Sequence, residues 1–240
     1  MKNRTGILFP FIIPALLILT LLCGCKKSDN DKTPEGTGNT VTDVDGNVYP
    51  TVTIGGQVWM AANLRTTHYR NHQPVTPVSD SAQWAGLTTP GYCMYNNDAA
   101  LAAVYGYLYN WYAVTDTNNL APSGWHVPTD ADWVALENAL GSTAGGAMKT
   151  TGTTQWNSPN TGATNSSGFS GIPGGDRSYN GSYHYMGQYA CWWSTTENTT
   201  ATAWEHVAKY NSSSILRMNY SKNLGLSVRC VKDIPLHHPF

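Results

Sequence analysis

The stretch SGWHVPTDADWVALENALG, residues 123–141, contains the clearest local signal in this 240-residue chain. Pro128 disfavours helical backbone at the residue before it, so a helix has to begin after this point. Thr129 is a good N-cap residue, and Asp132 stands three positions later, as in a shortened capping box. Asp130 and Asp132 both fall in the first turn, where the helix dipole favours negative charge. The sequence therefore predicts a helix that begins next to Thr129.

The remainder of the stretch supports this helix. Trp133, Leu136 and Leu140 follow at helical spacing, and Gly141 is a typical stop signal. His126 precedes the helix, and a histidine close to two aspartates also suggests a metal or catalytic site. Because helix-start chemistry already accounts for both aspartates, we interpret the group as a capped helix and not as a site.

Two runs of alternating apolar and polar residues come earlier, at 48–54 and 57–60. Two glycines join them, which is typical of a β-hairpin. Upstream, Asp43, Asp45 and Asn47 with Gly46 look like the start of an EF-hand loop. No glutamate follows at the twelfth position and no helix follows the loop, so we predict a turn there.

The middle and the end of the body contain shorter elements. Residues 92–114 are ambiguous between helix and strand, and we predict a helix in their first half, capped by Asn96, Asn97 or Asp98. Short strands are predicted at 168–172 and 190–194, and two further strand-like runs, at 203–210 and 214–220, lead into the closing stretch 225–233. Between them the chain is rich in Gly, Asn, Ser and Thr, so we expect long loops.

The N-terminus has the pattern of a bacterial lipoprotein signal. Basic residues precede an apolar run that ends in LCGC, and we predict a signal peptide over 1–25 with Cys25 as the lipidated residue, the attachment point for palmitate and other acyl chains. Residues 26–40 are polar and form a predicted flexible tether. The domain then spans 41–234, and 235–240 form a C-terminal tail. The predicted location is the bacterial cell envelope, with the chain anchored by lipid to the outer membrane or cell surface.

Composition restricts the function. The chain is 41% hydrophobic and 12% charged with a net charge of −1, and it lacks the basic patches that nucleic-acid binding needs, so we predict no nucleic-acid partner. Cys93, Cys191 and Cys230 remain after Cys25 is assigned to lipid. In an oxidising compartment three cysteines suggest one disulfide and one free thiol.

Several motifs from Asp43 to Asp233 resemble the Fibrobacter succinogenes major paralogous domain, a family of bacterial secreted and lipoprotein modules. They are DVDGNVYPTVTIGGQVWMAANLRTT, YCMYNNDAA, YGYLYNWYAV, APSGWHVPTDADW, TNSSGFSGIPGG, WWSTTEN and SVRCVKD. Their order is also similar to that in the superfamily of formylglycine-generating enzymes and C-type-lectin-like domains. The resemblance implies an α+β fold of the C-type-lectin-like kind, with a small mixed antiparallel sheet, two helices and long loops that carry the ligand surface.

The departures from those patterns matter for function. The Glu-Pro-Asn, Gln-Pro-Asn and Trp-Asn-Asp motifs of calcium-dependent lectins are missing, and Cys191 and Cys230 are too far apart in sequence for the paired cysteines of formylglycine-generating enzymes. Ala121 stands where many relatives carry a cysteine. Histidines and acidic residues, Asp176 and Glu205 among them, are scattered outside any catalytic motif. We therefore predict no catalytic residue, no metal ligand, no cofactor and no enzymatic activity.

Aromatic and amide residues cluster near the C-terminus, and they favour binding of an external glycan or protein. Trp192, Trp193 and Trp204 are expected in the core, although Trp204 is also a candidate for binding. The predicted ligand surface spans 204–223, with a second cluster at 179–185. The candidate binding residues are Tyr179, Tyr183, His184, Tyr185, Trp204, His206, Tyr210, Asn211, Arg217, Asn219 and Tyr220. This arrangement resembles the lectin-like target proteins of diversity-generating retroelements. A structural role in assembly of the envelope and an enzyme related to formylglycine-generating enzymes are the alternatives.

Overall fold

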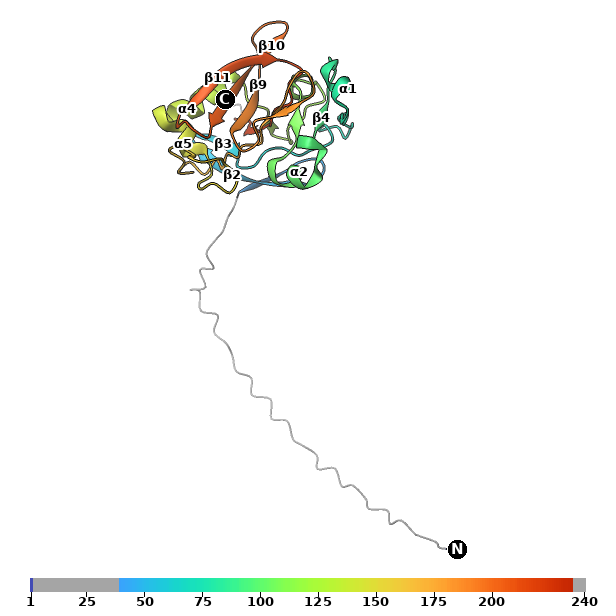
Figure 1. Ribbon diagram of the computed structural model, residues 1–240, viewed down its shortest axis with the longest axis horizontal. Coiled ribbons are helices and arrows are strands. Elements are labelled where there is room, and N and C mark those ends of the chain that lie inside the picture. Colours follow the sequence, from blue (N-terminus) through green and yellow to red (C-terminus); the bar gives the residue numbers. More distant parts are fainter. Residues whose placement is uncertain (2–38, 235–240) are drawn as a thin grey trace, which may run out of the picture. The chain divides into compact units, whose positions relative to one another are not determined.

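The computed structural model describes residue 1 and residues 39–234 (Figure 1). The chain divides into a unit of residues 1–37 and a domain that begins at residue 38. Most of the predicted signal peptide, Cys25, the tether up to residue 38 and the tail at 235–240 lie outside the described residues. Within the described part of the chain, no helix has both the length and the apolar character needed to span a bilayer.

The domain has an α+β fold in which all named strand pairs are antiparallel. A five-stranded sheet has the order β1-β2-β3-β12-β6. Its strands are β1 Thr40–Thr42, β2 Val48–Ile54, β3 Gln57–Met60, β12 Val231–Lys232 and β6 Trp125–His126. The predicted hairpin is confirmed, since Gly55 and Gly56 join β2 to β3 with φ angles of 58° and 85°, a backbone region that favours glycine.

A second sheet is formed by three longer strands in the order β11-β10-β9. They are β9 Tyr189–Glu197, β10 Thr202–Lys209 and β11 Ile215–Ser221, so the strand-like runs predicted here are confirmed. Two small hairpin-like pairs complete the β structure: β4 Tyr92–Cys93 with β5 Leu108–Tyr109, and β7 Asp176–Arg177 with β8 Tyr183–His184.

The strand predicted at 168–172 is wrong. Gly168 and Ser170 have φ angles of 71° and 55°, in the left-handed region, which no β-strand adopts. The segment is a loop whose strand-like pairing is limited to a bridge between Gly171 and Lys149, while Phe169 packs into the aromatic core.

Five α-helices are present within residues 39–234, where the sequence predicted two. They are α1 Ser81–Ala85, α2 Ala99–Tyr105, α3 Trp111–Val114, α4 Asp130–Leu140 and α5 Ala144–Met148, with short 3-10 turns η1 Tyr95–Asn97 and η2 Gly141–Thr143. The two predicted helices are α2 and α4. Helix α2 stops at Gly106, whose φ of 78° ends the helix, so the apolar spacing that continues to Leu108 belongs to a strand.

The start of α4 is as the sequence predicts. Thr129 Oγ1 accepts from Asp132 N–H at 3.2 Å, and the Asp132 carboxylate accepts from Thr129 N–H at 2.8 Å, which completes the capping box. His126 adds to the same cluster, because its Nε2 lies 3.3 Å from Asp132 and its Nδ1 lies 2.7 Å from Asp233. The histidine thus helps to fix the helix start against the C-terminal strand.

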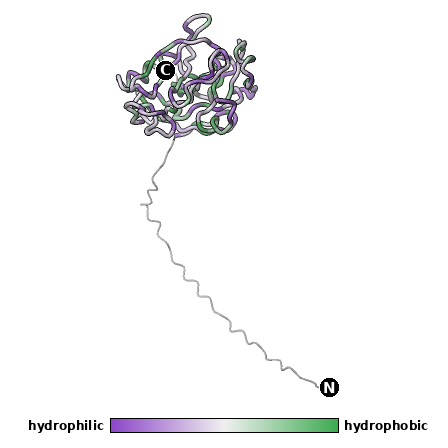
Figure 2. Tube along the Cα trace, in the orientation of Figure 1, coloured by the Kyte–Doolittle hydropathy of each residue, from purple (hydrophilic) through white to green (hydrophobic). Residues whose placement is uncertain are grey.

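Hydrophilic and hydrophobic residues are interspersed throughout the described domain (Figure 2). An aromatic core lies beneath α4, where the rings of Trp59 and Trp133 are 4.8 Å apart and those of Trp133 and Trp192 stack at 5.7 Å. Trp193 is equally buried. In Figure 1, α4 and α5 lie at one side of the domain and α1 and α2 at the other, with the three-stranded sheet between them.

The expected disulfide is not present. Cys93, Cys191 and Cys230 are all free and buried. Cys93 belongs to an apolar cluster around Trp84, whereas Cys191 and Cys230 lie within the larger core. Their role in the domain is therefore packing.

Buried basic side chains hold the irregular loops. The guanidinium of Arg229, which is fully buried, donates to the carbonyls of Met60, Phe169 and Ser170 at 2.7–2.9 Å and to Asn63 Oδ1 at 2.7 Å. One side chain thereby joins β3, the 168–172 loop and the C-terminal segment.

Lys149 has the same role in a second loop region. Its ammonium group donates to the carbonyls of Thr161, Lys209 and Ser212 at 2.8–2.9 Å. Burial lowers the pKa of this amine to about 8. Loop carbonyls that no sheet or helix satisfies are thus paired with side-chain donors, as buried backbone groups require.

We predict that Arg229→Met destabilises the domain strongly, by about 4 kcal/mol or more, because it leaves several buried acceptors without a donor. Arg65→Met is the matched control, since Arg65 is only partly buried and donates to a single side chain, Asn47, at 3.2 Å. Urea unfolding of both variants measures the difference. A loss below about 1 kcal/mol for Arg229→Met would contradict the proposed role of the guanidinium.

Candidate functional site

The sheet of β9, β10 and β11 has two faces with different roles. Directly opposed residues of an antiparallel pair point to the same face, and neighbours along a strand point to opposite faces. Trp204 is opposite Asn219 and His206 is opposite Arg217, so these four share one face. Glu205 is opposite Met218, and together with Tyr220 they point to the other face.

The first face packs against α4. His206 is fully buried, with Nδ1 2.6 Å from Glu137 and Nε2 3.2 Å from Asp130, and its ring stacks on Trp133. Arg217 forms a bidentate pair with the same Asp130 at 2.7 and 2.9 Å. The guanidinium also covers the ring of Trp204.

This geometry corrects part of the predicted site. His206 has no exposed surface and cannot contact a ligand, and Arg217 and Trp204 are engaged in a network that anchors the sheet to α4. Asn219 is exposed on this face opposite Trp204, away from the predicted residues Tyr179, His184, Tyr185 and Tyr220. Because side chains alternate between the two faces of a strand, the residues expected to form one ligand surface at 204–223 lie on two opposite faces of the sheet.

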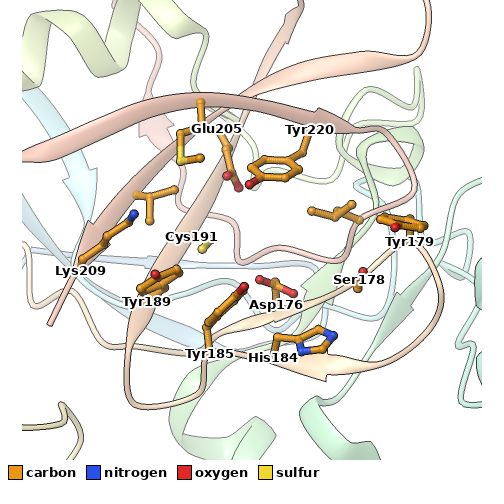
Figure 3. A pocket seen from close by; sticks show the side chains of 13 residues that line it. Asp176, Ser178, Tyr179, His184, Tyr185, Tyr189, Cys191, Glu205, Lys209 and Tyr220 are labelled. Carbon is orange, nitrogen blue, oxygen red and sulfur yellow. The ribbon is translucent and has the colours of Figure 1, made fainter.

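The second face forms the back of a pocket of about 340 Å³ (Figure 3). The strand pair β7–β8 and the loop that follows it form the opposite wall. Four of the predicted residues line this pocket: Tyr179, His184, Tyr185 and Tyr220. The three tyrosines are well exposed, with 61%, 45% and 42% of their surface accessible, so these residues are available to a ligand.

The other predicted residues lie outside the pocket. Tyr183 turns inward, where its ring packs 5.1 Å from that of Tyr95 and its hydroxyl donates to Asn97 at 3.0 Å. Tyr210 is partly buried in the turn that follows β10 and packs against the aromatic core. Asn211 is exposed in the same turn. The structure therefore brings together the residues around 179–185 with Tyr220, and not with Tyr210 or Asn211.

Two buried carboxyl groups face the pocket, and sequence analysis did not assign them to the site. Glu205 projects from β10 and Asp176 from β7, on opposite walls (Figure 3). Glu205 is 3% exposed, and its Oε2 is buried without a hydrogen-bond partner among the described residues. Burial raises the pKa of Asp176 to about 7. Burial and the neighbouring Asp176 raise the pKa of Glu205 to about 8.

Alternation along β7 places Asp176 in the pocket and the adjacent Arg177 in the interior. Arg177 is fully buried, donates to the carbonyls of Val78, Ser79 and Gly181, and stacks over Trp84 at 4.6 Å. This guanidinium fixes the wall of the pocket from behind. Its N–H groups donate to backbone carbonyls, so the guanidinium does not form an ion pair with the Asp176 carboxyl.

Aromatic and basic groups complete the pocket. The rings of Tyr185 and Tyr189 stack with centroids 4.4 Å apart, and the ammonium of Lys209 lies 4.9 Å above the ring of Tyr189. Cys191 lies deep in the pocket wall, and burial raises the pKa of its thiol well above the ordinary value. That thiol is protonated at neutral pH and is a poor nucleophile.

Sequence analysis missed Asp176, Tyr189, Glu205 and Lys209 as site residues. The alternation of side chains along a strand could have identified two of them. Glu205 and Lys209 are separated by an even number of positions in β10, so they point to the same face, and both line the pocket. In the described part of the chain, no three His, Cys, Asp or Glu side chains are grouped to hold a metal ion. The two carboxyls and the tyrosines instead form a site suited to hydrogen bonding and stacking.

The raised carboxyl pKa values predict how stability depends on pH. The folded domain retains protons on Asp176 and Glu205 that the unfolded chain releases above its ordinary pKa of about 4, so the free energy of unfolding falls as pH rises from about 5 to 8. In Glu205→Gln the free energy of unfolding should fall less between pH 5 and 8 than in wild type, by a difference on the order of a few kcal/mol. Glu197→Gln, which changes an exposed carboxyl of β9, should leave it unchanged.

Urea unfolding of the three proteins at pH 5, 6.5 and 8 measures the effect. Equal slopes for wild type and Glu205→Gln would show that the Glu205 carboxyl titrates in its ordinary range.

The chain was compared with protein families, curated proteins and solved structures. A model of the Fibrobacter succinogenes major domain matches residues 52–232, which is most of the chain and contains the pocket. No curated protein and no solved structure matches significantly. The chain therefore belongs to the Fibrobacter succinogenes major domain family, as the motifs in its sequence indicated.

Proposed function

We propose that this protein is a lipid-anchored lipoprotein of the bacterial cell envelope, at the outer membrane or cell surface, that binds an external glycan or protein. Family membership supports a surface-associated protein. The observation that carries the binding proposal is the pocket of about 340 Å³, where exposed tyrosines surround two buried carboxyls. That volume lies at the small end of ligand pockets, so the site accepts one sugar unit or one side chain of a larger partner.

The lining is chemically suited to recognition. Tyrosine offers a flat apolar ring and a hydroxyl at little cost in side-chain entropy, and its ring stacks on sugars or on other planar groups. Glu205 and Asp176 hold hydrogen-bonding capacity that the domain itself does not use. A ligand that pairs with these groups recovers the free energy lost by burying them.

The proposed fold relationship is with C-type-lectin-like domains. The α+β architecture, the long loops and the C-terminal three-stranded sheet support it. In the target proteins of diversity-generating retroelements, variable residues lie near the C-terminus on a fixed scaffold. The pocket face of β10 and β11 is the place where such variation would act in this chain.

Binding is proposed here in preference to catalysis. The thiols of Cys93, Cys191 and Cys230 are buried, and burial raises the pKa of each, which opposes cysteine chemistry of the formylglycine-generating kind. The pKa values of Asp176 and Glu205 are both raised, whereas an acid and base pair needs environments that push the two values apart. No cofactor is required by this proposal.

The adjacent residues Tyr220 and Asn219 test the position of the binding site. Tyr220 lines the pocket and Asn219 is exposed on the opposite face of the same strand. With a ligand selected from a glycan array or a peptide library, Tyr220→Ala should weaken binding at least tenfold, as a central interface tyrosine does, and Asn219→Ala less than twofold.

Both variants should unfold within about 0.5 kcal/mol of wild type, because each side chain is exposed. Isothermal titration and urea unfolding give the two quantities. Equal losses of affinity for the two variants, or none for Tyr220→Ala, would place the site elsewhere.

Cys25→Ser tests the anchor. A thioether bond to lipid needs the cysteine sulfur, so this variant should incorporate no palmitate label and should move from the membrane fraction to the soluble fraction. Cys23→Ser is the matched control and should remain labelled and membrane-bound. Label retained in Cys25→Ser would contradict the assignment of the lipidated residue.

A further inference from the structure

We infer that the pocket between β7–β8 and the β9–β11 sheet takes a positively charged nitrogen, the ammonium group of an amino sugar or of a lysine side chain. This inference rests on the proposed binding function and specifies the ligand chemistry of that same site. It is carried by the uncompensated carboxyls, by the tyrosine faces around them and by the contrast with every buried cation of the domain.

The buried cations are all satisfied. Arg229, Arg177 and Lys149 each donate to at least three acceptors within the described domain. The fourth buried cation, Lys222, donates to the carbonyl of Thr200 and pairs with Glu197. Glu205 and Asp176 are different, because neither side chain accepts a hydrogen bond from any other described residue and Glu205 Oε2 is buried without a partner. Unpaired buried polar groups are rare and destabilising, so they indicate a missing partner.

Among the described residues, the pocket contains no side chain that pairs with Asp176 or Glu205. Lys209 lines the pocket, and its ammonium lies above the ring of Tyr189 and forms no salt bridge with either carboxyl among the described residues. Its charge lowers the pKa of Glu205, but burial and Asp176 outweigh this effect and the pKa stays raised. Lys209 does show that a pocket tyrosine accepts an ammonium group on its face. Tyr185, stacked on Tyr189, and Tyr220, beside Glu205, offer further π surface around the empty volume (Figure 3).

An ammonium group is the chemistry that complements this lining. It carries three donors and no acceptor, so it pairs with two carboxyls at once and needs no acceptor in return. Because both carboxyls are buried, their attraction to an ammonium group is screened less than it would be in bulk water. A neutral hydroxyl supplies one donor and no charge, and so recovers less of what burial of the carboxyls costs.

Proton linkage follows from the same geometry. The titratable groups that face the volume are Asp176, Glu205, His184, Lys209, Cys191 and the lining tyrosines. The pKa values of Asp176 and Glu205 are about 7 and 8 without ligand, and a bound cation lowers both. Binding therefore releases protons, and affinity for a cation that keeps its charge rises as pH increases from 6 to 8.

The test uses two pairs of small probes and the detergent-purified full chain. Nα-acetyl-lysine methylamide is compared with its Nε-acetylated form, and methyl glucosaminide with methyl N-acetylglucosaminide, by isothermal titration at pH 7. In at least one pair the amine should bind at least tenfold more tightly than its neutral counterpart. The pair that shows the difference identifies a protein side chain or an amino sugar as the source of the nitrogen.

Variants and pH complete the test. Glu205→Gln should weaken binding of the amine at least tenfold, and the matched control Glu197→Gln should have no effect, because Glu197 is exposed outside the pocket. For the lysine probe, should it bind, affinity should rise at least tenfold from pH 6 to pH 8. His184→Gln should retain that rise, which assigns it to the carboxyls.

The outcomes separate this inference from the proposed function. If the acetylated probes bind as well as the amines and Tyr220→Ala abolishes both, the pocket is a binding site but the inference of a cation is wrong. If the amines bind and neither Glu205→Gln nor Tyr220→Ala matters, the pocket is not the site. If no probe binds at millimolar concentration, the inference of a cationic ligand is overturned.

Discussion

Donation from buried basic side chains to loop carbonyls is the interaction on which this structure depends. Much of the domain is irregular chain, and its buried carbonyl groups lack partners in sheets or helices. Arg229, Arg177 and Lys149 supply those partners. Arg70 does the same at the rim, with donations to the carbonyls of Ala121, Pro122 and Trp125 at 2.7–3.1 Å. Most of these contacts join segments that are far apart in sequence, so a few cations fix long loops.

This arrangement also explains the pocket. Arg177 is held by carbonyls on the interior side of β7, and the alternation of the strand then places Asp176 in the pocket. On the facing sheet, the pairing of Arg217 and His206 with Asp130 fixes the outer face against α4 and leaves Glu205 on the inner face. The two walls hold two carboxyls that form no ion pair with any side chain of the described residues. A preorganised site of this kind loses little entropy when a ligand binds.

Local chemistry made much of the fold predictable from sequence. The capping box at Thr129, the two glycines of the β2–β3 hairpin and the apolar alternation of β9 to β11 each specify their element through neighbouring residues. The loop at 168–172 was missed because its left-handed residues override an apolar pattern typical of a strand. Half of the site was missed for another reason. Whether Glu205 or His206 faces the pocket depends on which face of β10 packs against α4, a long-range fact that composition does not contain.

Asp176 and Glu205 are buried in the free protein, and neither forms an ion pair among the described residues. The most direct measurement is ¹³C NMR of the side-chain carboxyl carbons of aspartate and glutamate, followed across pH and assigned with Asp176→Asn and Glu205→Gln. One resonance should titrate near pH 7 and vanish in Asp176→Asn, and a second should titrate near pH 8 and vanish in Glu205→Gln. Titration of both resonances below about pH 5, the ordinary range for carboxyl groups, would contradict this prediction.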